Sequence, residues 1–77
     1  MVHAYVLVKA DVGAAADLVE TIRGIDAVAE AHVVAGDWDL IAEVDAPEVY
    51  DVLSAVSEQI GRLDGVVDTK TYVSMEE

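Results

Sequence analysis

The sequence predicts an α+β, ferredoxin-like fold of order βαββαβ, with a four-stranded antiparallel sheet and two helices on one of its faces. Strand-like and helix-like patterns follow one another in that order along the 77 residues. The chain contains a short internal echo, that is, a weak sequence repeat: residues 25–30 (IDAVAE) resemble residues 63–68 (LDGVVD). Each stretch joins the end of a helix to a strand, so the same junction is expected in each half. The length suits a single domain spanning residues 1–77.

The first half of the chain predicts a strand, a helix and a second strand. Residues 2–9 (VHAYVLVK) are rich in β-branched side chains, and apolar residues occur at both odd- and even-numbered positions. This pattern predicts a strand that is buried on both faces. Residues 11–13 interrupt it, and residues 14–23 then carry an apolar stripe at helical spacing. Gly24 stands where a C-cap glycine would follow this helix. Residues 28–35 (VAEAHVVA) predict the second strand.

The second half predicts a hairpin, a helix and a final strand. Gly36 opens a tight turn in which a positive φ is allowed, and residues 39–44 (DLIAEV) predict the third strand. Residues 45–48 (DAPE) form a helix-start signature in which the Asp supplies the capping side chain. Apolar residues at helical spacing continue over 49–60, and residues 66–75 predict the last strand.

Strand alternation sorts the side chains between the two faces of the sheet. Small apolar residues, including Ala29 and Val67, are expected under the helices, with Val28 and Val66 on the opposite face. That opposite face mixes large apolar side chains with charges of both signs, which is typical of an interface. We expect a face-to-face dimer there; the alternative is a solvent-facing sheet. The expected interface residues are His3, Tyr5, Leu7, Glu30, His32, Ile41, Glu43, Lys70 and Tyr72.

The charge of the chain excludes several function classes. A formal net charge of −12, with only four basic residues, argues against direct nucleic-acid binding. A hydrophobic content of 55% indicates a folded chain rather than a disordered acidic one. There is no apolar run of membrane-spanning length and no basic signal-peptide start, so a cytoplasmic location is expected. Lysine depletion beside an acid excess is typical of a halophile's cytosolic protein; an ordinary acidic protein is the alternative.

Catalytic and cofactor motifs do not emerge from the residues, so no enzyme activity and no cofactor are expected. The serines lack a G-x-S-x-G context, and the dispersed glycines form no phosphate loop. His3 and His32 together with Glu30 or Glu43 could in principle hold zinc. Because no HxH or HxxxH spacing supports such a site, no metal is expected.

The hairpin turn is the strongest candidate binding site. Gly36, Asp37, Trp38 and Asp39 place the only tryptophan of the chain on a turn between two carboxylates. The two carboxylates can bind an ammonium group, and the indole ring can cover it. This combination predicts a binding site for a small molecule. The alternative is a structural turn in which Trp38 folds over the edge of the core.

The sequence also resembles a known family. The hairpin over residues 35–40 (AGDWDL), the entry into the second strand over 25–28 (IDAV) and the final strand over 66–72 (VVDTKTY) resemble the effector-binding (RAM) domain of Lrp/AsnC transcriptional regulators. The resemblance implies a sheet-to-sheet homodimer, assembly into higher oligomers, and an amino acid or related effector bound between dimers near the hairpin. Gly36, Trp38 and Asp39 match the family's hairpin motif, whereas Asp37 falls where the family varies.

Full-length members of that family carry an N-terminal helix-turn-helix that reads DNA. This chain begins at the first strand of the RAM pattern and so resembles a stand-alone form. The resemblance then implies that the chain senses a small effector and acts through a partner regulator or a transporter, and not by binding DNA directly. Ion-uptake proteins are a separate candidate class of partner, because small sensory domains often serve potassium systems in salt-adapted cells.

Two other classes share this order of elements. A cofactor-free oxygenase of the dimeric α+β barrel type would need a roomy pocket between helices and sheet, lined by aromatic residues and a His or Asn. The positions expected to face the helices are instead mostly Ala and Val. An ACT-type amino-acid sensor would dimerise side by side through its strands or helices, so the geometry of the dimer distinguishes it from a RAM domain.

Overall fold

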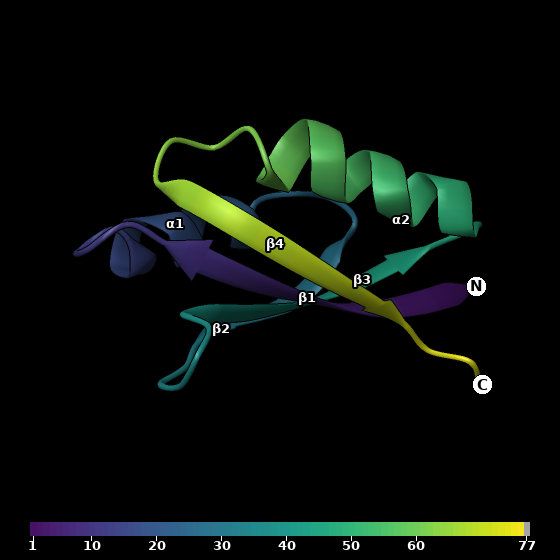
Figure 1. Cartoon of the computed structure of the whole chain (residues 1–77). Coiled ribbons are helices and arrows are strands. Elements are labelled where there is room, and N and C mark those ends of the chain that lie inside the picture. Colours follow the sequence, from purple (N-terminus) through teal and green to yellow (C-terminus); the bar gives the residue numbers. More distant parts are fainter. Residues whose placement is uncertain (77) are drawn as a thin grey trace.

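A computed structural model describes residues 1–76 and shows the expected order of elements (Figure 1). The sheet has four strands in the order β2-β3-β1-β4, and every neighbouring pair is antiparallel. The α+β βαββαβ prediction is therefore confirmed. The elements are β1 (Val2–Ala10), α1 (Ala15–Arg23), β2 (Val28–Val33), β3 (Leu40–Ala46), α2 (Val49–Ala55), the π-helical segment η1 (Val56–Ile60) and β4 (Val66–Val73).

Both helices cover the same face of the sheet, and the core lies between these two layers (Figure 1). Central strand positions such as Val6, Leu40 and Val44 have no exposed surface and pack against Ile22 of α1 and Val52 of α2. Each such aliphatic side chain stabilises the fold by about 1.5–3 kcal/mol through burial. None of the helices within residues 1–76 is long and apolar enough to cross a membrane.

A β-bulge at the start of β2 changes which side chains face the core. Val28 pairs with Val44, but Glu30 pairs with the next residue of β3, Glu43, so Ala29 is an extra residue in the strand. Val28 is consequently buried and Ala29 is exposed, the reverse of the strict alternation expected from the sequence. After the bulge, Glu30 lies on the face opposite the helices, as expected.

The same irregularity recurs at the start of β4. Val66 pairs with Ala10 and Asp68 with Lys9, which leaves Val67 as the extra residue. Val66 packs against the core and Val67 is 60% exposed, so these two assignments from the sequence were also wrong. The echo between the two halves of the sequence therefore marks two junctions that share a bulge.

Asp45 belongs to a strand and does not cap α2. Strand β3 continues to Ala46, and Asp45 pairs with His3 of β1. The residue that precedes α2 is Glu48, in an extended conformation and without a side-chain capping hydrogen bond. The helix-start prediction was wrong at Asp45 because sheet pairing and the contact with His3 hold this residue in the strand.

The second helix ends in a wider turn than the sequence pattern predicts. Its last five residues form η1, which closes where the Gly61 N–H donates to Val56 O at 2.7 Å. This wider turn does not alter the apolar face that α2 presents to the sheet, since Val56 and Ile60 both remain buried. The strands also differ from their predicted bounds: β2 ends at Val33, β3 begins at Leu40, and β4 ends at Val73.

Arg23 protects the free edge of β2. Its Nε and Nη2 atoms donate to Ala31 O at 3.0 and 2.9 Å, and its Nη1 lies 3.1 Å from Glu20 Oε2. An unpaired strand edge invites pairing with other chains, and occupying one of its carbonyls reduces that tendency. The sequence pattern predicts Arg23 only as the last residue of a helix. The contact with the edge of β2 is an additional role.

Candidate functional site

The hairpin between β2 and β3 is fixed to the end of β1. The Asp39 N–H donates to Val8 O at 2.9 Å, and Asp39 Oδ2 accepts a hydrogen bond from the Ala10 N–H at 2.8 Å. These two bonds flank Lys9, just past Val8–Leu40, the last register pair of β1 with β3, while β1 itself continues beside β4 to Ala10. Asp39 therefore has a structural function in addition to any ligand function.

Lys9 also reaches the hairpin. Its Nζ atom donates to Asp37 O at 2.8 Å, so an ammonium group lies beside the turn that carries Asp37 and Asp39. Lys9 was not among the residues expected at this site from the sequence. Antiparallel pairing of β1 with β3 was the available signal, because it brings the end of β1 beside the start of β3.

The turn itself is open. Gly36 and Asp37 are exposed, and Trp38 and Asp39 are half-buried. Gly36 does not adopt a positive φ, contrary to the expectation; within residues 1–76 the glycines that do are Gly13 and Gly65. Four surface hollows, of about 280, 350, 310 and 390 Å³, are lined by other residues. A ligand at the hairpin would need a further surface to enclose it.

The nine residues predicted for the dimer interface do share one face of the sheet, opposite the helices; we call it the outer face. Register pairing forms one row of Glu30, Glu43, Tyr5 and Tyr72, and a second row of His32, Ile41, Leu7 and Lys70. His3 lies on the same face beside Asp45. Tyr5 and Tyr72 are 43% and 52% exposed, and both helices lie on the other side (Figure 1).

His3 lies between two carboxylates of β3. Its Nδ1 atom lies 2.5 Å from Asp45 Oδ1, and its Nε2 atom lies 3.1 Å from Glu43 Oε1. The hydrogen bond to Asp45 raises the pKa of His3 above its ordinary value of 6.5; Glu43 adds to the rise, and partial burial opposes it. The His3 ring also meets Tyr5 edge to face, with centroids 5.0 Å apart. The sequence does not predict Asp45 at this site, because its local pattern is typical of a helix cap.

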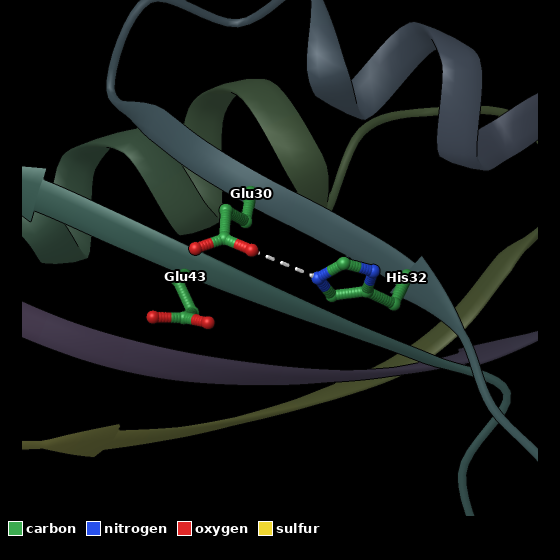
Figure 2. Close-up of side chains that lie close together, drawn as sticks. All are labelled: Glu30, His32 and Glu43. Atoms are coloured by element: carbon green, nitrogen blue, oxygen red, sulfur yellow. Dashed lines mark hydrogen bonds and ion pairs between the residues drawn. The ribbon is translucent and has the colours of Figure 1, made fainter.

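Glu30, His32 and Glu43 form a second cluster on the outer face (Figure 2). One ligand atom from each lies within 4.8 Å of the other two, and His32 Nε2 is 3.1 Å from Glu30 Oε1. The zinc site weighed from the sequence would have used both histidines. The structure instead places His32 near both glutamates, in contact with Glu30, whereas His3 contacts Glu43 from the β1 side.

The space between the helices and the sheet is filled by aliphatic side chains. Ala4, Val6, Val8, Ala42 and Val44 have no exposed surface, and within residues 1–76 no buried side chain is polar or charged. The aromatic and histidine side chains expected of an oxygenase pocket are absent from this layer of the described chain. The structure therefore offers no support for the enzyme alternative.

Comparisons with known proteins agree on one family. The family model for the Lrp/AsnC ligand binding domain matches residues 3–77. The leucine-responsive regulatory protein of Escherichia coli (strain K12) is 36% identical over 56 residues, which cover 73% of this chain and 34% of that protein. The chain thus spans about a third of the length of the curated relatives it matches.

Two solved structures are similar over nearly their whole length. TTHA0845 from Thermus thermophilus has a TM-score of 0.95 and 31% identity, covering 100% of this chain and 96% of that one. The crystal structure of FFRP-DM1 has a TM-score of 0.92 and 28% identity, covering 97% of this chain and 100% of that one. The arrangement of strands and helices described above is therefore shared with both.

Proposed function

This chain belongs to the Lrp/AsnC ligand-binding domain family, and from that premise we propose that it binds an amino acid or a related metabolite at an interface between copies of itself. The effector would contact the β2–β3 hairpin through Gly36, Asp37, Trp38 and Asp39. In this account the chain is a regulatory module, consistent with a family whose members are typically non-catalytic.

The juxtaposition of Lys9 with the hairpin carboxylates carries this proposal. An α-amino acid presents an ammonium and a carboxylate on one carbon atom, so its site needs charges of both signs close together. Asp39, and Asp37 beside it, would receive the ammonium. Lys9, which already donates to Asp37 O at 2.8 Å, would receive the carboxylate. Among the described residues, no hydrogen bond engages Asp39 Oδ1, which leaves that oxygen for the ligand.

The openness of the hairpin supports a site completed by a second copy. Gly36 and Asp37 are exposed, and none of the four hollows described above is lined by residues 36–39. We infer that copies first dimerise through the outer face and that dimers then meet at their hairpins. The half-exposed Tyr5 and Tyr72, beside Leu7 and Ile41, give the outer face an apolar centre with a charged periphery.

Transmission of the signal is part of the same proposal. With a net charge of −12, the chain is unsuited to contact DNA phosphates directly, so ligand binding would act through a partner regulator or a transporter. The leucine-responsive regulatory protein is a relative whose name states a response to an amino acid. The matched segment covers 34% of that relative, so its wider activity is not transferred to this chain.

A thermal-shift screen of the twenty amino acids at high salt, followed by calorimetry on each hit, tests the proposal. We expect at least one amino acid to raise Tm and to bind saturably. The variant Asp39→Asn keeps an acceptor for the Ala10 N–H but removes the negative charge, and it should weaken binding about tenfold or more. The charge-matched control Glu48→Gln, far along the chain on an exposed residue, should bind as the parent does. Stabilisation by no amino acid would leave the module with an assembly role only.

A further inference from the structure

We propose that Glu30, His32 and Glu43 form a binding site for a divalent transition-metal ion of the zinc type on the outer face of the sheet (Figure 2). This site is separate from the hairpin, and it does not depend on the proposed effector function. It also differs from the expectation drawn from the sequence, where the two histidines lack a metal-binding spacing and no metal is expected.

Strand geometry places the three side chains together. Glu30 and His32 are two residues apart on β2, so both project from the same face of the strand. Glu43 is the register partner of Glu30 across the β2–β3 pair. The bulge at Ala29 creates this pairing, because a regular strand continuing from Val28–Val44 would have placed Ala29 opposite Glu43.

The spacing suits a single ion. One ligand atom from each residue lies within 4.8 Å of the other two. Ligand atoms around a tetrahedral zinc lie about 3.3–3.6 Å apart, given bond lengths of about 2.0–2.2 Å. The exposed ends of Glu30 and His32 are not held by core packing, so we expect side-chain rotation to close the remaining gap.

The two neighbouring carboxylates of the cluster favour a bound cation. Two carboxylates directly opposite each other on neighbouring strands repel one another and destabilise the pair. His32 Nε2 contacts only the Glu30 side of this pair at 3.1 Å, and His3 Nε2 contacts Glu43 at the same distance from the other side. An ion bound among the three ligands would neutralise both carboxylates at once, and the strongly acidic chain raises the local concentration of cations.

The ligand types select the class of metal. One imidazole nitrogen with two carboxylates suits zinc, cobalt, nickel or manganese, whereas magnesium and calcium prefer oxygen ligands alone. The side chains of Glu30, His32 and Glu43 are 59%, 56% and 28% exposed, so the fourth coordination position faces away from the sheet. Water fills that position in a single copy, and a side chain of a second copy can fill it in a dimer.

Calorimetric titration of the untagged chain with zinc chloride tests the proposal, with cobalt absorption as a second readout of coordination. We expect saturable binding at a stoichiometry of one ion per chain, or one per two chains if a second copy completes the site. Excess magnesium should not displace the zinc. His32→Gln and Glu43→Gln, both on half-exposed or exposed positions, should each weaken binding at least tenfold.

Matched controls separate this site from the general attraction of an acidic surface. Glu48→Gln removes one exposed carboxylate elsewhere and should leave zinc affinity unchanged. His3→Gln removes the other histidine of the outer face but none of the proposed ligands, and it should retain binding. Zinc binding that is absent, that magnesium abolishes, or that persists undiminished in both His32→Gln and Glu43→Gln would overturn the proposal. Far-ultraviolet circular dichroism confirms that each variant is folded.

Discussion

Leu7 and Ile41 lie directly opposite each other in the β1–β3 pair, and both side chains point away from the helices. They occupy the middle of the outer face, where the proposed dimer would bury them. We predict that Ile41→Lys shifts the chain from dimer to monomer at high salt, because a buried lysine without a partner charge is costly at the centre of an interface. Sedimentation equilibrium over a concentration series measures the shift.

An exposed apolar residue on the other layer provides the control for that variant. Tyr50 of α2 is 77% exposed, and Tyr50→Lys should leave the oligomeric state unchanged. A parent chain that remains monomeric at tens of micromolar would contradict the sheet-face dimer. So would a dimer that dissociates in Tyr50→Lys but not in Ile41→Lys.

Salt should govern this assembly. At a net charge of −12, two copies repel each other, and this repulsion is screened when the Debye length falls from about 10 Å at 0.1 M salt to about 3 Å at 1 M. We predict that the oligomer forms at molar salt and dissociates in dilute buffer. Sodium and potassium chloride should act alike at equal ionic strength. An oligomer unchanged in dilute buffer would contradict this prediction, and circular dichroism distinguishes dissociation from unfolding.

The backbone conformation and the close packing at position 65 both require a glycine. Its φ is +97°, and a Cβ atom there would lie 3.1 Å from Ala14 Cβ and 3.4 Å from Leu18 Cδ1. We predict that Gly65→Ala lowers the free energy of unfolding by about 2–4 kcal/mol, from backbone strain plus overpacking. Gly13 has a similar φ of +80° with no atom within 4 Å, so Gly13→Ala should cost only about 1 kcal/mol. Equal losses in urea unfolding at fixed salt would show that the contact with Ala14 is unimportant.

The pair formed by His3 and Asp45 should make stability depend on pH. The folded-state pKa of His3 is raised above its ordinary value of 6.5, chiefly by the hydrogen bond to Asp45. The stabilisation is therefore fully present below about pH 6.5 and is lost as the pH rises through the folded-state pKa. In a chelator-containing buffer, NMR titration of the ring protons should give a pKa above 6.5. Asp45→Asn should lower it, whereas Asp26→Asn should not; a pKa at or below 6.5 in the parent chain would refute the pairing.

The order of elements could be predicted from the sequence because apolar periodicity changes clearly between strands and helices. Side-chain alternation also placed all nine outer-face residues correctly. It failed at Val28, Ala29, Val66 and Val67, since a bulge adds one residue and reverses the alternation, and no residue type at these positions signals an extra residue. The π-helical end of the second helix was not predictable either, because it leaves the apolar pattern unchanged.

The candidate sites were less predictable because they depend on contacts between distant segments. Asp45 satisfied a helix-cap pattern locally, and only the pairing of β1 with β3 brings it to His3. The contact of Lys9 with Asp37 and the meeting of Glu30 with Glu43 likewise follow from strand register. Register is set by the packing of the whole sheet, which a local pattern does not encode.

Fluorescence of Trp38 tests the central claim most directly, because it is the only tryptophan of the chain and lies half-buried in the proposed effector hairpin. Titration with an amino acid that stabilises the chain should change its emission saturably, with the same Kd as calorimetry. The Asp39→Asn variant should need about tenfold or more ligand for the same change. Calorimetric binding with no change in Trp38 emission, and with equal affinity in Asp39→Asn, would place the effector elsewhere and contradict the account.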